Sequence, residues 1–173
     1  METELSFATQ LARRAGAVLT ELSGRVGVEY KDGVEPVTEA DRRSDAVIRE
    51  AIAATFPHHR ILSEESEETV DLAGPVWIVD PLDGTANYAR GHPYSAVSIA
   101  CAIDGVVQVG VVHAPFMDET FTAARGRGAH LNGTPIRPSN PPDLRHAVVS
   151  TGFSPGPASL SPHPPSTTPW RNC

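Results

Sequence analysis

This chain of 173 residues has only two cysteines, and their spacing fits neither a disulfide framework nor a cysteine metal site. Cys101 lies in an apolar segment and Cys173 is the last residue, so we expect one buried, inert thiol and one thiol in the tail. No apolar run approaches the roughly 20 residues that cross a bilayer. The start of the chain, Met1 to Glu4, is acidic, whereas a signal peptide would be basic. We therefore expect a cytoplasmic protein with no membrane partner.

Positive charge is also scarce. Lysine and arginine together number 14, against 21 aspartates and glutamates, which gives a formal net charge of −7. This balance argues against nonspecific nucleic-acid binding, so we expect no nucleic-acid partner. It also gives no long-range attraction for an anionic substrate. Bound cations would have to reverse the field locally, because a divalent ion is often the largest charge in its site.

The chain begins with two expected helices. Apolar residues recur at helical spacing from Leu5 to Leu22, and Gly24 is placed to end that element. A loop that contains Lys31 leads to Thr38–Asp41, which resembles a capping box and predicts a second helix that stops before Pro57.

The sequence after these two helices, up to about residue 151, predicts strands. Two short ones cover 60–63 and 76–79, and 95–103 and 106–113 form a hairpin around Asp104-Gly105. Further strands are expected at 120–124, at 130–131, ended by Asn132-Gly133, and at 147–151. Two helices followed by a mainly antiparallel sheet indicate an α+β fold. We assign residues 1–153 to this domain and 154–173, which hold six prolines, to a disordered tail.

Acidic residues follow two of the predicted strands. Asp80 comes directly after Val76–Val79, Pro81 favours an extended backbone at Asp80, and Asp83 follows one turn later. Gly84-Thr85 can open a helix whose N-terminus suits a phosphate. Glu64-Glu65 follows the strand 60–63. Alone, each cluster would be a turn or a solvated loop, but together they indicate a carboxylate site for Mg²⁺ and a phosphate ester.

The same residues resemble those of the inositol monophosphatase family of magnesium-dependent, lithium-sensitive phosphatases. The similarity runs from the first helix to about Phe153 and includes 37–41, 64–65, 80–88, 91–93, 126–129 and 131–133. It implies that the chain forms the first half of a layered αβαβα sugar-phosphatase fold, with the second half missing. It also implies that Glu64, Asp80 and the Leu82 carbonyl hold a first Mg²⁺ with Glu65 nearby, and that Asp80 and Asp83 share a second.

The resemblance implies a mechanism as well. Glu64 and Thr85 would orient a metal-activated water, and Asp41 would accept a hydrogen bond from Thr85, so that the Thr85 hydroxyl can accept from that water. Asp83, Gly84 and Thr85 would contact the substrate, expected to be myo-inositol 1-phosphate, and no covalent phosphoenzyme forms. Relatives act on histidinol phosphate, fructose 1,6-bisphosphate or nucleotide 3′-phosphates. Family members are often dimers, so the resemblance also allows a homodimer.

Asp41 and Thr85 also have simpler interpretations. Without the resemblance, Asp41 is better explained as a helix-start carboxylate that complements the helix dipole, and Thr85 as an N-cap.

Haloacid-dehalogenase-type phosphatases also place an Asp-Gly-Thr motif after a strand, but they separate their two aspartates by one residue and need a downstream lysine. Here two residues, Pro81 and Leu82, separate the aspartates, and the only lysine, Lys31, lies upstream, so this alternative fails on both counts.

The other alternative is a truncated, catalytically inactive fragment that binds metal. In the family a Trp-Asp motif in the second half donates a further aspartate, whereas Trp170 is followed here by Arg171. The change in composition near Ser154 motivates the hypothesis of a frameshift, which translation of the other two frames of the DNA would test.

Overall fold

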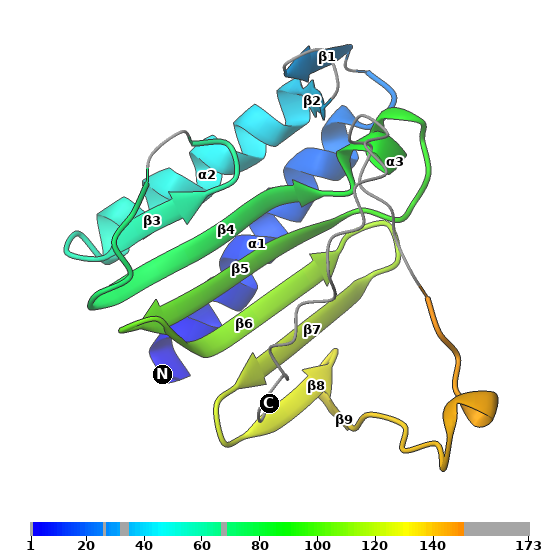
Figure 1. Ribbon diagram of the computed structural model, residues 1–173. Helices are drawn as coiled ribbons and strands as arrows, with labels where there is room; N and C mark the ends of the chain where they lie inside the picture. Colours follow the sequence, from blue (N-terminus) through cyan, green and yellow to red (C-terminus); the bar gives the residue numbers. More distant parts are fainter. Residues whose placement is uncertain (1, 26, 32–34, 67–68, 151–173) are drawn as a thin grey trace, which may run out of the picture.

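The computed structural model describes residues 2–25, 27–31, 35–66 and 69–150. Its centre is a seven-stranded sheet in the order β3-β4-β5-β6-β7-β8-β9, with α1 and α2 on one face (Figure 1). The strands are β3 Arg60–Ser63, β4 Pro75–Asp83, β5 Ala96–Ile103, β6 Val106–Ala114, β7 Glu119–Ala124, β8 Gly128–Leu131 and β9 Thr134–Ile136. All neighbours are antiparallel except β3 and β4, which are parallel. The expected α+β class and mainly antiparallel sheet are confirmed.

The two long helices pack through small and branched apolar residues. Helix α1, Glu2–Leu22, buries one stripe at helical spacing, which consists of Ala8, Leu11, Ala12, Ala15, Gly16 and Leu19. Helix α2, Glu39–Thr55, buries Ile48 and Ile52 completely. Trp77 of β4 is fully buried and tilts against the rings of Phe7 and Phe56, so the core joins both helices to the sheet.

Three short elements complete the described chain. Strands β1, Val28–Lys31, and β2, Glu35–Thr38, form an antiparallel pair just before α2, where the sequence had suggested a loop. Helix α3, Thr85–Ala89, follows β4, and a 3₁₀ turn covers Leu144–His146. No helix in the described ranges is long and apolar enough to cross a membrane.

Three strand predictions need correction. Residues 147–150 are not a strand: Val148 and Val149 are 101% and 73% exposed, and none of the described strands pairs with them. The strand expected at 76–79 extends through Asp83, and the strand expected at 130–131 begins at Gly128. It ends at Asn132-Gly133 as expected, and this turn leads into β9, which the sequence did not predict. The predicted tail, 154–173, and Thr151 lie outside the described residues.

Candidate active site

The two acidic clusters meet because β3 and β4 run parallel, so that their carboxyl ends lie at the same edge of the sheet. Ser63 is in register with Val79, which places the next residues, Glu64 and Asp80, beside each other. The backbone N–H of Glu64 donates to the Val79 carbonyl at 3.1 Å, which continues the ladder past the end of β3. The sheet register alone therefore brings residues 16 positions apart in the sequence to one place.

The segment from Asp80 to Asp83 leaves the regular ladder. The register between β4 and β5 shifts between these two residues, which marks a bulge. Inside the bulge the Leu82 N–H donates to Asp80 Oδ1 at 3.2 Å, and the buried Ser44 hydroxyl of α2 donates to the Pro81 carbonyl at 2.8 Å. A proline is tolerated here because a bulge needs no N–H from it. Asp80 is half-buried, Asp83 is exposed, and the Leu82 side chain fills the core.

Asp41 links the start of α2 to Thr85. Its Oδ2 accepts from the Thr38 N–H at 2.7 Å and from the Thr38 hydroxyl at 2.6 Å, so it is the acidic member of a capping box. Its Oδ1 lies 3.0 Å from the Thr85 hydroxyl. Capping and the Thr85 contact thus occur together. Burial raises the pKa of Asp41, against the effect of the hydrogen bonds from Thr38 and Thr85.

The Thr85 hydroxyl is placed between two acceptors, since it also lies 3.0 Å from the Leu82 carbonyl. It has one hydrogen and can donate to only one of them at a time. Thr85 is the first residue of α3, and the N-cap is Gly84, so the N-cap alternative for Thr85 is wrong. Helix α3 has only five residues, which makes it a weaker phosphate cradle than a full helix.

Gly84 is required by its backbone and its neighbour. Its φ is +84°, and a Cβ there would lie 2.7 Å from the Tyr94 carbonyl. Asn87 donates its side-chain N–H to the same carbonyl at 2.9 Å. The turn after β4 is therefore held closely against the start of β5.

The electrostatics of the site are dominated by neighbouring carboxyl groups, one of which is half-buried. Burial, the charge and hydrogen bond of Glu64, and the charge of Asp83 raise the pKa of Asp80 to about 7. Since a carboxyl–carboxyl hydrogen bond requires a proton, the contact with Glu64 favours the protonated form of Asp80. Within the described ranges, no arginine, lysine or histidine forms an ion pair with Glu64, Asp80 or Asp83.

In their donor chemistry these residues suit a hard divalent cation, because they supply carboxylate and carbonyl oxygens. Such oxygens repel one another unless positive charge lies between them. The structure nevertheless does not bring them into a finished cluster. Among the described residues, no group of three or more His, Cys, Asp or Glu side chains has the arrangement to hold a metal ion. Glu64 and Asp80 are in contact, whereas Asp83 interacts with Asp80 through its charge alone.

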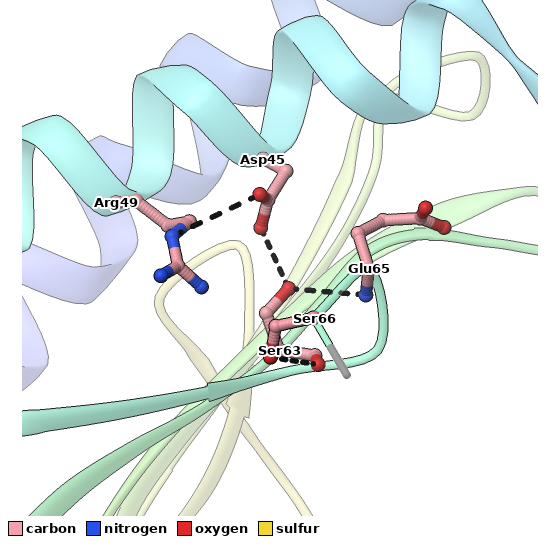
Figure 2. Close-up of polar contacts among 5 residues, drawn as sticks. All are labelled: Asp45, Arg49, Ser63, Glu65 and Ser66. Atoms are coloured by element: carbon pink, nitrogen blue, oxygen red, sulfur yellow. Dashed lines mark hydrogen bonds and ion pairs between the residues drawn. The ribbon is translucent and has the colours of Figure 1, made fainter. Parts of the chain in front are cut away.

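Figure 2 shows the turn that carries Glu65. The Glu65 N–H lies 3.4 Å from the Ser63 hydroxyl, and the Glu65 carboxyl group points away from the contact between Ser63 and Asp45. Ser66 closes the turn by donating its hydroxyl to the Ser63 carbonyl at 2.9 Å.

Sequence reasoning missed three side chains that hold this site, namely Ser44, Asp45 and Ser63. A signal for two of them was present, because Ser44 and Asp45 follow Asp41 by three and four positions and so share its helix face. Two histidines, His59 and His113, have partners outside the site. His59 accepts from the Trp77 indole at 3.1 Å, and His113 is buried beneath α1, so both have structural contacts.

Comparison with known proteins agrees with this geometry. The inositol monophosphatase family matches residues 1–162. A protein from Salmonella typhimurium named Nus factor SuhB is 41% identical over 157 residues, and the Nus factor SuhB of Pseudomonas aeruginosa is 40% identical over 159. Each alignment covers 88% of this chain and 59% of the relative. The chain thus spans about three fifths of the length of these curated relatives.

Solved structures lead to the same family. An IMPase from Thermotoga maritima superposes with a TM-score of 0.75 at 40% identity, covering 80% of this chain and 54% of that one. The inositol monophosphatase from Anabaena gives 0.70 at 43% identity, covering 81% and 51%. The fold is therefore that of the N-terminal half of these structures, as expected. This chain belongs to the inositol monophosphatase family.

Proposed function

We propose that the chain hydrolyses a phosphate monoester with Mg²⁺ and a metal-activated water, and that myo-inositol 1-phosphate is the substrate. The observation that carries the proposal is the contact between Glu64 and Asp80 at the joined ends of β3 and β4. Burial and the neighbouring Glu64 raise the pKa of Asp80, and a carboxyl group in such a place is a costly arrangement for a fold alone. A divalent cation between them removes the repulsion, and family membership supports the phosphatase class.

Each site residue has a part in this proposal. Glu64, Asp80, Asp83 and the Leu82 carbonyl would hold Mg²⁺, with Glu65 nearby. The bound cations neutralise phosphoryl oxygens, lower the pKa of the attacking water and stabilise the leaving alkoxide. Thr85 donates its hydrogen to Asp41, which leaves its oxygen free to accept from the water. Glu64 orients that water, and Asp83, Gly84 and Thr85 contact the substrate.

The proposed substrate class has support among the solved structures. IMPase-II of Staphylococcus aureus, 31% identical to this chain, has been crystallised with inositol monophosphate and with 2′AMP. Both ligands are phosphate monoesters of a ring alcohol. Histidinol phosphate, fructose 1,6-bisphosphate and nucleotide 3′-phosphates remain the alternatives to be compared in the assay.

Phosphate release by the purified chain tests the proposal. We expect Mg²⁺-dependent turnover of myo-inositol 1-phosphate, faster than that of histidinol phosphate, and its loss in Asp80→Asn. Turnover that persists in Asp80→Asn, or that needs no divalent cation, would show that these carboxylates are not the metal site.

A second candidate function is metal binding without turnover. One observation favours it: among the described residues, the acidic side chains do not form a group of three or more that could hold a metal ion. Mg²⁺ would then raise the unfolding temperature of the wild type but not of Asp80→Asn, and no phosphate would be released.

The proposals on partners and location rest on composition and resemblance. The curated relatives are named Nus factors. That name gives no support to the expectation that this chain has no nucleic-acid partner. A gel-shift assay with RNA tests that expectation, and sedimentation tests the homodimer. The cytoplasmic location stays a prediction.

A further inference from the structure

One face of α2 reaches both strand ends of the candidate site. Asp41 contacts Thr85, Ser44 donates to the Pro81 carbonyl, and Asp45 accepts from Ser63. The first contact holds the start of α3, the second holds the end of β4, and the third holds the end of β3. Because the three helical residues lie within one turn, the helix acts as a fixed spacer between the two acidic clusters.

On β3, the residue that contacts this face of α2 is Ser63. It is the last residue of the strand, 2% exposed, and directly precedes Glu64. Its hydroxyl lies 2.6 Å from Asp45 Oδ1, and the Glu65 N–H lies 3.4 Å from the same hydroxyl oxygen (Figure 2). The carboxylate cannot donate, so the single hydroxyl hydrogen points to Asp45 and the oxygen lone pairs are left for the Glu65 amide.

The Asp45 carboxylate also has an ion-pair partner on its own helix. Its side chain is 16% exposed, and its second oxygen lies 4.0 Å from Arg49 Nε one helical turn later. A hydrogen bond to an ionised acceptor is shorter and stronger than one between neutral groups, which agrees with the 2.6 Å separation. The chain of contacts runs from a rigid helix through Asp45 and Ser63 to the backbone of the Glu64–Glu65 turn.

We propose that Asp45 and Ser63 are positioning residues, which hold the Glu64–Glu65 turn at the distance from Asp80 that Mg²⁺ binding needs. This inference rests on the proposed function. Neither residue would touch the cation. Their effect is on the placement of its ligands, in the way that outer-shell partners orient metal ligands.

Calorimetric titration of the full chain with MgCl₂ is the test. Asp45→Ala and Ser63→Ala should each weaken Mg²⁺ binding by about tenfold or more, since loss of an outer-shell partner costs ~10–100-fold in affinity. Asp45→Asn keeps an acceptor oxygen for Ser63 and should retain most of the affinity. Thr9→Ala removes a hydroxyl that donates to the Leu5 carbonyl on α1, so it serves as a matched deletion that leaves binding unchanged.

A second readout needs no metal. In the metal-free protein, amide hydrogen exchange at Glu65 should accelerate in Asp45→Ala and Ser63→Ala but not in Asp45→Asn or Thr9→Ala. If Ser63→Ala does not fold, the two substitutions at the partly exposed Asp45 carry both measurements.

The outcomes separate the two proposals. Wild-type affinity in both alanine variants overturns the positioning role and leaves the proposed function standing. Faster exchange at Glu65 with unchanged affinity does the same, because the contact is then structural only. If the wild type binds Mg²⁺ no better than Asp80→Asn does, the proposed function is wrong, and this inference is wrong with it.

Discussion

At the scale of the residue, burial and the neighbouring Glu64 and Asp83 disfavour the charged form of Asp80. A carboxyl group whose pKa rises on folding to about 7 favours the fold while it is protonated and disfavours it once ionised. Its destabilising effect therefore grows as the pH rises from the unfolded value, near 4, through about 7. A bound cation would reverse this effect, so one residue couples stability to metal.

Asp80→Asn should consequently make the metal-free protein more stable at pH 8, by on the order of 1–3 kcal/mol, because the amide is neutral and can donate to Glu64. The same variant should lose all stabilisation by Mg²⁺. Urea denaturation with and without 5–10 mM Mg²⁺, roughly the excess needed for mass-action stabilisation, measures both effects. A metal-free variant that is less stable than the wild type would contradict the argument.

Gly84 gives a second prediction at this scale, with a control in the same loop. Gly84 and Gly91 both have positive φ, +84° and +72°, but only at Gly84 would a Cβ meet backbone, the Tyr94 carbonyl at 2.7 Å. Gly91→Ala should cost about 1 kcal/mol for its φ alone, and Gly84→Ala about 1–3 kcal/mol more for the clash. The free energies of unfolding from denaturant titration give the comparison, and equal losses would mean that the turn adjusts freely.

At the scale of the element, α1 lies so close to β6 that only glycine fits between them. A Cβ on Gly16 would lie 2.5 Å from His113 Cδ2 and 3.2 Å from Pro115 Cβ. His113 Nδ1 lies 3.0 Å from the Thr120 hydroxyl, and Arg13 Nε lies 3.4 Å from the same oxygen. The imidazole is thus enclosed by a helix, a strand and a hydrogen-bonded hydroxyl, with a cation nearby.

This packing predicts a pH dependence of stability. Burial, aided by the charge of Arg13, lowers the pKa of His113, against the Glu119 carbonyl and the charge of Asp118. Between the lowered folded value and the unfolded value near 6.5, the unfolded chain binds more protons, so this residue's contribution to stability rises with pH and is complete above about 6.5. The difference in unfolding free energy between wild type and His113→Gln should therefore grow from pH 5 to pH 7.

The exposed His92 supplies the control, since His92→Gln removes an imidazole that the core does not enclose. Comparing each variant with the wild type at every pH removes the opposite trend expected from Asp80. A His113→Gln profile parallel to that of the wild type would show that the histidine is accommodated in either charge state.

Elements that local pattern determines were predictable from the sequence, and contacts between elements were not. The stripe from Leu5 to Leu22 and the turn at Asp104-Gly105 specify α1 and the β5–β6 hairpin by themselves. The extension of β4 through Pro81 depends on a bulge against β5, which local propensity does not reveal. The Asp45–Ser63 contact depends on how α2 packs against β3. From the sequence alone, Ser63 could therefore be identified only as the end of a strand.

At the scale of the whole molecule, the sheet has two different faces. Side chains on one face, such as Val109 and Val111, are buried under the helices. Alternation along β6 turns Val112 to the other face, where it is 39% exposed beside a hollow of about 340 Å³ that Ala100, Phe121 and Ile136 also line. No described helix covers this second face (Figure 1). Contiguous exposed apolar surface of this kind promotes association.

Val112→Lys should therefore reduce self-association of the chain, measured by light scattering across a concentration series. The lysine replaces apolar surface in the middle of the open face, and its stem can lie along the strand while its charge stays in water. The free energy of unfolding should change by less than about 0.5–1 kcal/mol, because the position faces away from the core. Val148→Lys is the matched control, since Val148 is 101% exposed but lies outside the sheet. Equal scattering from the two variants would show that the open face of the sheet is not the surface through which the chains associate.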